Sequence, residues 1–508
     1  MSRLTRYGIG LGTTACLVGC TVGPDYSTPQ MEVPSAFSTT LDASAHSIVS
    51  PDIVDTEWWH ALGDPVLSDL IDEAMEHNRS VASAVARVRE SRALARAAGA
   101  RDRPAVGGTG FYERRRASEN GIIDLESIPG ASLENDLFQG GFDASWEIDL
   151  FGGARRTVED AVARYQATIE DRRALTLSVI AEVAATYAEY RGAQSRRAVL
   201  RDNIRIQSES RDRVESNVKV GFAGALDLAR AEAQLAQTRA LEPGLTSAVR
   251  VAAFRLAVLV GRTPGEIDVL LEGAGEQALG VPDVIPVGLP SELIRRRPDV
   301  RGSERRLAAA TAEIGVNTAE LYPRVSLTGA FAMQSTSIGD VVDIGSRTWR
   351  IGPSVRWRLF EGGRLRSLVD AAEARQEAAA ADFEQAVLLA LEEVEASLTV
   401  HAAEIDRRLD LRHSVAQSRR AYDAAVSLYQ DGLEDAFFVL DAERDLAERT
   451  QLLAESEQAV LVSLVAVYKA LGGGWEPYDA SFEHREAGAP DRDLPTQDVG
   501  GGRAARSQ

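Results

Sequence analysis

Residues 349–359 read WRIGPSVRWRL and belong to the clearest period-two pattern in the chain. Large apolar residues fill five of the six odd-numbered positions, namely Trp349, Ile351, Val355, Trp357 and Leu359. The even-numbered positions are polar or small and include Arg350, Arg356 and Arg358. A period-two alternation of this kind predicts a β-strand. An apolar face backed by a charged face is typical of a strand in a transmembrane barrel, although a half-buried soluble sheet also alternates.

Three further segments complete two strand hairpins. The segment at about 324–334 carries Val325, Leu327 and Phe331 at odd-numbered positions. Residues of about 137–149 carry Phe138, Phe142 and Trp146 on one face, and Asp143 and Glu147 on the other. The fourth segment, about 105–113, is rich in glycine and has a weaker pattern. We therefore expect four strands whose apolar positions face lipid and whose charged positions face a lumen.

Four strands are too few to close a barrel, since the smallest outer-membrane barrels have about eight strands. An open sheet edge inside lipid leaves backbone groups unpaired, at a cost of several kcal/mol for each group. If these strands cross a membrane, several copies of the chain must therefore share one barrel.

The chain also contains an internal repeat. Trp146 and Trp357 are 211 residues apart, and the same spacing separates Gly221 from Gly432. A spacing this regular indicates that both halves have the same order of elements. We expect each half to contain a helix, two strands and a long helical hairpin.

Long helices fill most of each half. Residues 152–219 contain no proline and only one interior glycine, so an unbroken helix here would be about 100 Å long. Apolar residues recur every three or four positions, which favours coiled-coil packing. Gly221 and Gly432 lie where the helical hairpins turn, and glycine accepts the left-handed backbone of a helix end. The expected fold is mainly helical with a β-barrel part, although soluble coiled coils without a pore stay possible.

The N-terminus has the features of an export signal. Arg3 and Arg6 precede an apolar segment that is too short to span a bilayer. This segment ends in Leu17-Val18-Gly19-Cys20, which looks like the lipobox of a bacterial lipoprotein. We expect cleavage before Cys20, acylation of this cysteine and anchoring in the outer membrane of a Gram-negative bacterium. An ordinary signal peptide with a chance cysteine is the alternative.

The composition argues against several classes of function. The chain has 508 residues and a net charge of -20, which argues against a nucleic-acid partner. It contains 2 Cys and 6 scattered His, and it has no Ser/His/Asp arrangement, phosphate loop or metal-ligand spacing. We expect no enzymatic activity, no metal and no cofactor other than the covalent lipid on Cys20.

Several motifs together resemble one family. They are Cys20-Thr21-Val22-Gly23-Pro24-Asp25-Tyr26, Trp58-Trp59, Asp64-Pro65, Arg297-Pro298-Asp299-Val300, the paired Trp…Leu-Phe…Gly-Gly segments and the two glycine-centred turns. In this order they resemble the outer membrane factor family of tripartite efflux systems, the lipoproteins similar to TolC and NodT. The resemblance implies a homotrimer with a shared twelve-stranded barrel above a periplasmic tunnel of helices. It also implies a passive exit duct for small molecules, docked through the turns at Gly221 and Gly432 to a periplasmic membrane-fusion adaptor, which links the duct to an inner-membrane RND-type pump.

The resemblance further implies a constriction at the periplasmic end of the tunnel. In the family a ring of residues after the second turn closes this end, and Asp441 occupies one such position. Phe438 stands where some members have Asp, so the gate would combine a carboxylate ring with an apolar ring. A solvated helix face for Asp441 and a packing role for Phe438 are the alternatives. A type I secretion duct, or a lipid-anchored periplasmic scaffold without a pore, would also fit the sequence.

The expected organisation has five parts. They are a signal peptide (1–19), a lipid-anchored strap (20–63), a first repeat (64–280), a second repeat (281–480) and a disordered tail (481–508). The strands of the second repeat are expected at about 324–334 and 349–360. The tail is rich in small and polar residues and has almost no large apolar ones.

Overall fold

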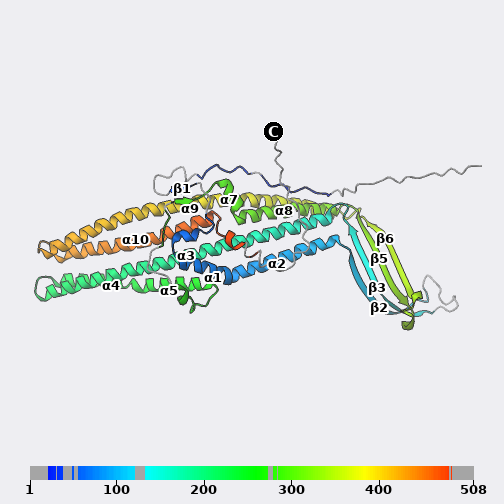
Figure 1. The fold of residues 1–508 in the computed structure, drawn as a ribbon, viewed down its shortest axis with the longest axis horizontal. Coiled ribbons are helices and arrows are strands. Elements are labelled where there is room, and N and C mark those ends of the chain that lie inside the picture. Colours follow the sequence, from blue (N-terminus) through cyan, green and yellow to red (C-terminus); the bar gives the residue numbers. More distant parts are fainter. Residues whose placement is uncertain are drawn as a thin grey trace, which may run out of the picture.

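The protein is a long rod of helices that ends in a small sheet of strands (Figure 1). The computed structural model describes residues 21–29, 31–37, 48–50, 55–120, 132–272, 279–282, 284–479 and 482. Cys20, the signal peptide expected at 1–19 and all but one residue of the tail expected at 481–508 lie outside the described residues. The expectation of a mainly helical chain with a smaller strand part is confirmed.

The first half contains short helices, one strand hairpin and a long helical hairpin. After β1 (Ile48–Ser50), its elements are η2 (Trp58–Leu62), α1 (Pro65–His77), α2 (Arg79–Gly99), η3 (Ala100–Asp102), β2 (Ala105–Arg116), β3 (Glu134–Ile148), α3 (Gly153–Lys219), α4 (Ala225–Arg239), α5 (Glu242–Leu259) and α6 (Ile267–Leu271). Asn78 separates α1 from α2, because its extended backbone ends the first helix and its side chain caps the second. The strands reach farther toward their connecting loop than the sequence pattern predicted.

The second half repeats this order. Its elements are β4 (Val284–Pro286), which pairs with β1, then α7 (Pro290–Arg296), α8 (Pro298–Ala319), β5 (Arg324–Ser335), η4 (Ile338–Asp340), η5 (Ile344–Ser346), β6 (Arg347–Arg356), α9 (Arg364–Gln430) and α10 (Ala436–Ala470). The two long helices α3 and α9 have the same length, 67 residues.

One strand, β6, ends before its predicted boundary at about residue 360. β6 ends at Arg356, so Trp357 and Arg358 lie beyond the strand and were wrongly predicted to belong to it. Arg358 instead makes an ion pair with Glu320 at 2.7 Å, in the turn between α8 and β5. Gly363 then adopts a φ of 90° before α9 begins. These contacts turn the chain away from the sheet and into the long helix.

The long helices lie side by side in one layer (Figure 1). α3 lies in the middle, with α8 and α10 on one side and α2, α4 and α5 on the other. α9 packs against α8 and α10 and forms an edge of the layer. α3 accordingly buries more than twice as many residues as α9. None of the described helices combines the length and the apolar content needed to cross a membrane.

The main apolar core lies partway along the rod, where both halves of the chain meet. Trp58, Trp59 and Tyr187 are almost fully buried in it. The ring of Trp58 stacks on that of Tyr468 with a centroid distance of 4.9 Å, and Trp58 Nε1 donates a hydrogen bond to the carbonyl oxygen of Gly473. The start of the first half is thereby joined to the end of the second.

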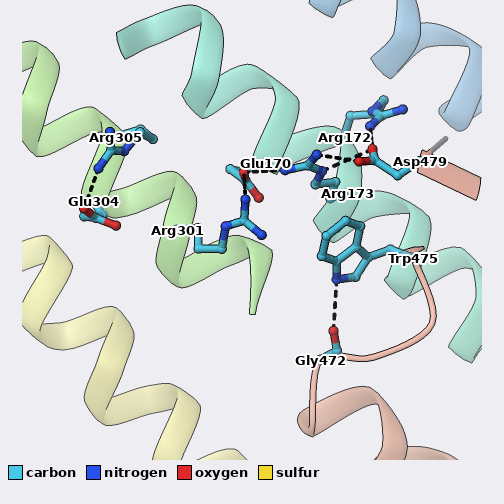
Figure 2. A network of polar contacts seen from close by, with 9 residues as sticks. All are labelled: Glu170, Arg172, Arg173, Arg301, Glu304, Arg305, Gly472, Trp475 and Asp479. Atoms are coloured by element: carbon cyan, nitrogen blue, oxygen red, sulfur yellow. Dashed lines mark hydrogen bonds and ion pairs between the residues drawn. The ribbon is translucent and has the colours of Figure 1, made fainter. Parts of the chain in front are cut away.

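A network of charged residues fastens the C-terminal segment to α3 (Figure 2). Asp479 accepts hydrogen bonds from Arg172 and Arg173. Trp475 lies beneath the guanidinium of Arg173, at 4.7 Å from the ring centroid. Arg173 and Arg301 both donate to Glu170, each at 2.7 Å. These contacts hold the end of the second half across α3 and α8.

Candidate functional site: the strand sheet and the helical turns

The two strand hairpins join into one antiparallel sheet with the order β2-β3-β5-β6. The halves of the chain meet where β3 pairs with β5, and there Phe142 lies opposite Phe331. Gly141 permits this close approach, because a Cβ at this position would collide with the backbone of Phe331 and Ala332. The sheet therefore needs strands from both halves.

One face of the sheet carries the positions predicted to contact lipid. Because paired residues share a face, the registers put Phe142, Phe331 and Trp349 in one cross-strand row. The same face holds Phe138, Trp146, Val325, Leu327 and Ile351. Phe142 is 64% exposed and Trp349 is 71% exposed. A single chain thus leaves a contiguous apolar face uncovered, which is unusual for a surface in water.

The opposite face of the sheet is polar. Asp143 shares a row with Ala330 and Arg350. Arg356 lies opposite Arg324, whose guanidinium makes an ion pair with Glu147 at 3.8 Å. The residues predicted to face a lumen therefore lie together on one face, apart from Arg358, which lies beyond β6.

The two halves make the same contact where the sheet joins the helices. Trp146 Nε1 donates a hydrogen bond to the carbonyl oxygen of Asp102, and Trp357 Nε1 donates one to that of Leu321, each at 3.1 Å. Each indole thus ties one end of a hairpin to the turn that precedes the hairpin. An aromatic ring with a polar tip suits the boundary between an apolar and an aqueous layer.

β2 and β6 form the two edges of this sheet. Within the described residues each of them pairs with one neighbouring strand only. Their outer backbone groups therefore lack a strand partner, which water tolerates and hydrocarbon does not. In lipid, both edges need additional strands.

The glycines predicted at the helical turns adopt the left-handed conformation, with φ of 82° at Gly221 and 70° at Gly432. Phe222 and Leu433 follow these glycines, and each donates its backbone N–H to a carbonyl five residues earlier. An apolar residue at this position commonly packs against its own helix. Here Phe222 is 86% exposed and Leu433 is 71% exposed. Each turn therefore presents an apolar side chain at the far end of the rod.

Asp441 and Phe438 lie near the start of α10, close to the second turn. Both side chains are exposed in the single chain. Asp441 accepts a hydrogen bond from Arg444 at 2.6 Å, so a partner on its own helix offsets its charge. Phe438 packs edge to face against Phe437, with 5.8 Å between the ring centroids. The two predicted gate residues are thus neighbours on one helix end.

Two contacts near the turns were not found from the sequence. Asn217 on α3 donates a side-chain hydrogen bond to the hydroxyl of Tyr429 on α9. Arg230 on α4 lies over the ring of Phe437 on α10, 5.1 Å from its centroid. Both contacts join the first helical hairpin to the second. The sequence did contain a hint of the second contact. Arg230 stands 211 residues before Asp441, so equivalent positions of the two halves carry opposite charges.

Glu443 is a second feature that sequence reasoning missed. Its side chain is only 3% exposed, and neither carboxyl oxygen has a hydrogen-bond partner among the described residues. Burial raises the pKa of this carboxyl, and the neighbouring Ser210 and Arg213 on α3 oppose the shift only in part. Burial also raises the pKa of Tyr422 on α9, with Glu443 adding to the effect. α10 therefore buries a carboxyl close to the gate residues.

Comparison with known proteins assigns the chain to a family. A family model described as outer membrane efflux protein matches residues 70–262 and 289–473, one stretch in each half. The solvent efflux pump outer membrane protein SrpC of Pseudomonas putida is 30% identical over 464 residues, which cover 90% of this chain and 96% of that protein. Outer membrane protein OprJ of Pseudomonas aeruginosa is 30% identical over 477 residues, which cover 93% of this chain and 98% of that protein.

A solved structure agrees with this assignment. The outer-membrane channel OprN matches with a TM-score of 0.83 and 35% sequence identity, over 90% of this chain and 100% of that chain. The family resemblance inferred from the sequence motifs is therefore confirmed. The chain belongs to the outer membrane efflux protein family and is an outer-membrane efflux channel protein.

Proposed function

We propose that three copies of this chain close into one passive duct through the outer membrane. The observation that supports this closure is that the sheet and the helical layer are open on the same two sides (Figure 1). β6 and α9 form one open side, and β2 forms the other together with α2, α4 and α5. In a ring of copies, β6 of one chain pairs with β2 of the next, and three four-stranded sheets supply twelve strands.

Exposed apolar residues along the helical edges support the same arrangement. They are Leu388, Leu389 and Val400 on α9, and Val251, Phe254 and Val258 on α5. Each Å² of apolar surface removed from water contributes about 25 cal/mol. Packing α9 of one copy against α4 and α5 of the next would bury both sets at once.

The duct transports small molecules without chemistry of its own. Its polar sheet face, with Asp143 and Arg350, lines the lumen, and its apolar face, with Phe142 and Trp349, contacts lipid. An inner-membrane RND-type pump supplies the energy, and a periplasmic adaptor joins that pump to the duct. The exposed Phe222 and Leu433 at the two turns are suitable apolar contacts for such an adaptor. The relative SrpC is named for solvent efflux, which favours a small-molecule cargo.

The far end of the tunnel forms the gate in this proposal. Phe438 and Asp441 of each copy together narrow the opening, and an apolar constriction resists the passage of water and ions. The contacts of Asn217 with Tyr429 and of Arg230 with Phe437 hold the two hairpins together and stabilise the closed state.

A lipid on Cys20 anchors the chain in this proposal. The next residues pack at the base of the sheet, where Val22 donates its backbone N–H to the carbonyl oxygen of Phe151 at 3.0 Å. The buried guanidinium of Arg156 donates to the carbonyl of Val22 and makes an ion pair with Asp25 at 2.7 Å. An acyl chain on Cys20 would therefore start beside the strands that enter lipid. Mass spectrometry of the mature protein should find acyl groups on Cys20 and none after Cys20→Ser.

The duct is tested on purified full-length protein in two measurements. Native mass spectrometry should give three chains per particle. Planar bilayers that contain the protein should show discrete single-channel currents. A monomeric particle, or a trimer that never conducts even with Phe438→Ala and Asp441→Ala, contradicts the proposal and favours a scaffold without a pore.

A further inference from the structure

A basic pocket lies along the helical rod, away from the sheet and the turns. Its volume is about 830 Å³, and α3, α9, α10 and the segment with Leu279 and Val281 enclose it. Five arginines line it: Arg191, Arg197, Arg201, Arg408 and Arg412. The only carboxylate among the described lining residues is Glu457. Such a local excess of positive charge stands out in a chain with a net charge of -20.

Three of the five guanidinium groups have carboxylate partners. The ion pairs are Arg191 with Asp64 at 2.6 Å, Arg201 with Glu242 at 3.0 Å, and Arg412 with Glu457 at 3.2 Å. Arg197 and Arg408 make no ion pair or hydrogen bond within the described part of the chain. The Nε atom of Arg408 is buried without a partner there. The pocket therefore holds two positive charges that the described residues leave unpaired.

The pKa shifts of Arg408 and His401 agree with a local excess of positive charge in the pocket. Burial lowers the pKa of Arg408, and the nearby Arg412 adds to the effect, while Glu457 opposes it. His401, earlier on α9, has its pKa lowered to about 4, first by burial and then by the charge of Arg408. His401 is therefore neutral at pH 7, and it adds no charge near the pocket.

The floor and the rim of the pocket have different exposure. Gly192 is buried and lines the floor, and a Cβ there would collide with the side chain of Gln458 on α10. The amide oxygen of Gln458 is buried and has no hydrogen-bond partner among the described residues. Arg201 and Arg412 at the rim have side chains that are 58% and 52% exposed. The cavity is therefore open to a ligand from solution.

We propose that this pocket binds a soluble dianion that bears a phosphate group. Two unpaired guanidinium groups match two negative charges, and their forked N–H donors fit phosphate oxygens. A lipid headgroup is disfavoured by distance, because Arg191 follows the start of α3 at Gly153 by 38 residues, or about 57 Å. The site is independent of the duct, since no gate residue or strand residue lines it.

The test measures binding of glycerol 3-phosphate to the purified full-length protein in neutral detergent by isothermal titration calorimetry. The expected result is saturable binding with one site per chain, weakened by added salt. Arg197→Gln with Arg408→Gln should weaken the affinity at least about tenfold. Arg197→Lys with Arg408→Lys should give an intermediate affinity, because the charge stays and the fork geometry is lost.

A matched control removes two other charges from the same helices. Arg205 and Arg407 are exposed, pair with carboxylates and lie outside the pocket lining. Arg205→Gln with Arg407→Gln should leave the affinity unchanged, and glycerol should not bind. The proposal is overturned if glycerol 3-phosphate shows no binding at concentrations up to about 10 mM, where even a very weak affinity would be detected. An unchanged affinity in Arg197→Gln with Arg408→Gln also overturns it.

The source of the phosphate is tested by adding phosphatidylglycerol to the micelles. Competition by this lipid, but not by phosphatidylcholine, would identify a headgroup as the occupant and overturn the assignment to a soluble ligand. This binding test does not measure single-channel conductance. A negative binding result would therefore leave the proposed duct unaffected.

Discussion

The two halves of the chain are more alike at the sheet end of the rod than along the helices that lead back from the turns. At the sheet end the halves make equivalent contacts, since Trp146 and Trp357 both donate to the turn before their own hairpin at 3.1 Å. At the other end the halves diverge. The first hairpin returns through two helices, α4 and α5, whereas the second returns through α10, which is continuous over 35 residues.

One proline in the first half accounts for the break between α4 and α5. Pro243 lies in the first turn of α5. Proline has no backbone N–H, so it is tolerated where a helix begins, but it would interrupt α4 if that helix continued. The residue 211 positions later is Ala454, which is buried in α10. The repeat is thus preserved where both hairpins must fit one sheet, and it is relaxed where the hairpins have different neighbours.

The largest effect is expected from Phe142→Arg at the sheet end. If Phe142 faces lipid as proposed, a charge at this position costs up to about 2–4 kcal/mol in each copy. We expect little trimer in outer-membrane fractions, measured by native gel electrophoresis. Asp143→Arg is the matched control on the polar face of the same strand, and its trimer yield should be near normal. Equal losses from both substitutions would show that the two faces do not differ.

At the turn end, Phe438→Ala combined with Asp441→Ala should raise single-channel conductance at least about twofold, because both side chains leave the proposed constriction. Glu448→Ala serves as a control, since Glu448 is exposed on α10 two helical turns beyond Asp441. It should leave the conductance unchanged. An equal gain from Asp227→Ala, 211 residues before Phe438, would mean that both hairpins form the gate alike.

Glu443→Gln should stabilise the protein at neutral pH, because the amide avoids the cost of burying a charge, about 1.4 kcal/mol for each unit by which burial raises the pKa of the carboxyl. Burial raises the folded-state pKa of Glu443 above its ordinary value of 4.5. Its contribution to stability is therefore fully present below about pH 4.5, and it is lost as the pH rises through the raised pKa. Thermal unfolding followed by circular dichroism from pH 4 to 8 should show the gain of the variant only at the higher pH.

The first half supplies the control for this substitution. Glu232 stands 211 residues before Glu443 but is exposed on α4. Glu232→Gln should leave the unfolding temperature unchanged at every pH. A similar gain in both variants would attribute the effect to net charge rather than to burial.

The smallest effect concerns the symmetric contact. Trp146→Phe and Trp357→Phe each remove one indole hydrogen bond, and each should lower the free energy of unfolding by about 1 kcal/mol. Denaturant titrations of the two variants should give equal losses. Clearly unequal losses would show that the halves are not equivalent even at the sheet end.

Much of the fold could be predicted because it follows from periodic patterns. The alternation around Phe142, Phe331 and Trp349 gave the strands and their faces, and the 211-residue spacing gave the repeat. The end of β6 was missed, since Trp357 and Arg358 continue the alternation although their side chains bind the preceding turn. A local pattern carries no information about such long-range partners.

The least predictable parts of the site are contacts between the halves. Asn217 and Tyr429 meet across two hairpins, and neither residue has a like partner in the repeat. The burial of Glu443 depends on α3 lying beside α10, which charge patterning alone does not reveal. The basic pocket was missed for the same reason, because its arginines come from helices that are distant in the sequence.

The pairing of β3 with β5 has a consequence for biogenesis. It joins residues 138–148 to residues 325–335, so the whole first helical hairpin lies between the partners in the sequence. Contacts this distant in sequence form slowly. Until the second hairpin forms, β2 and β3 have only each other as strand neighbours, and their outer edges can pair with other chains. We therefore expect the newly made first half to need a chaperone during its passage across the periplasm.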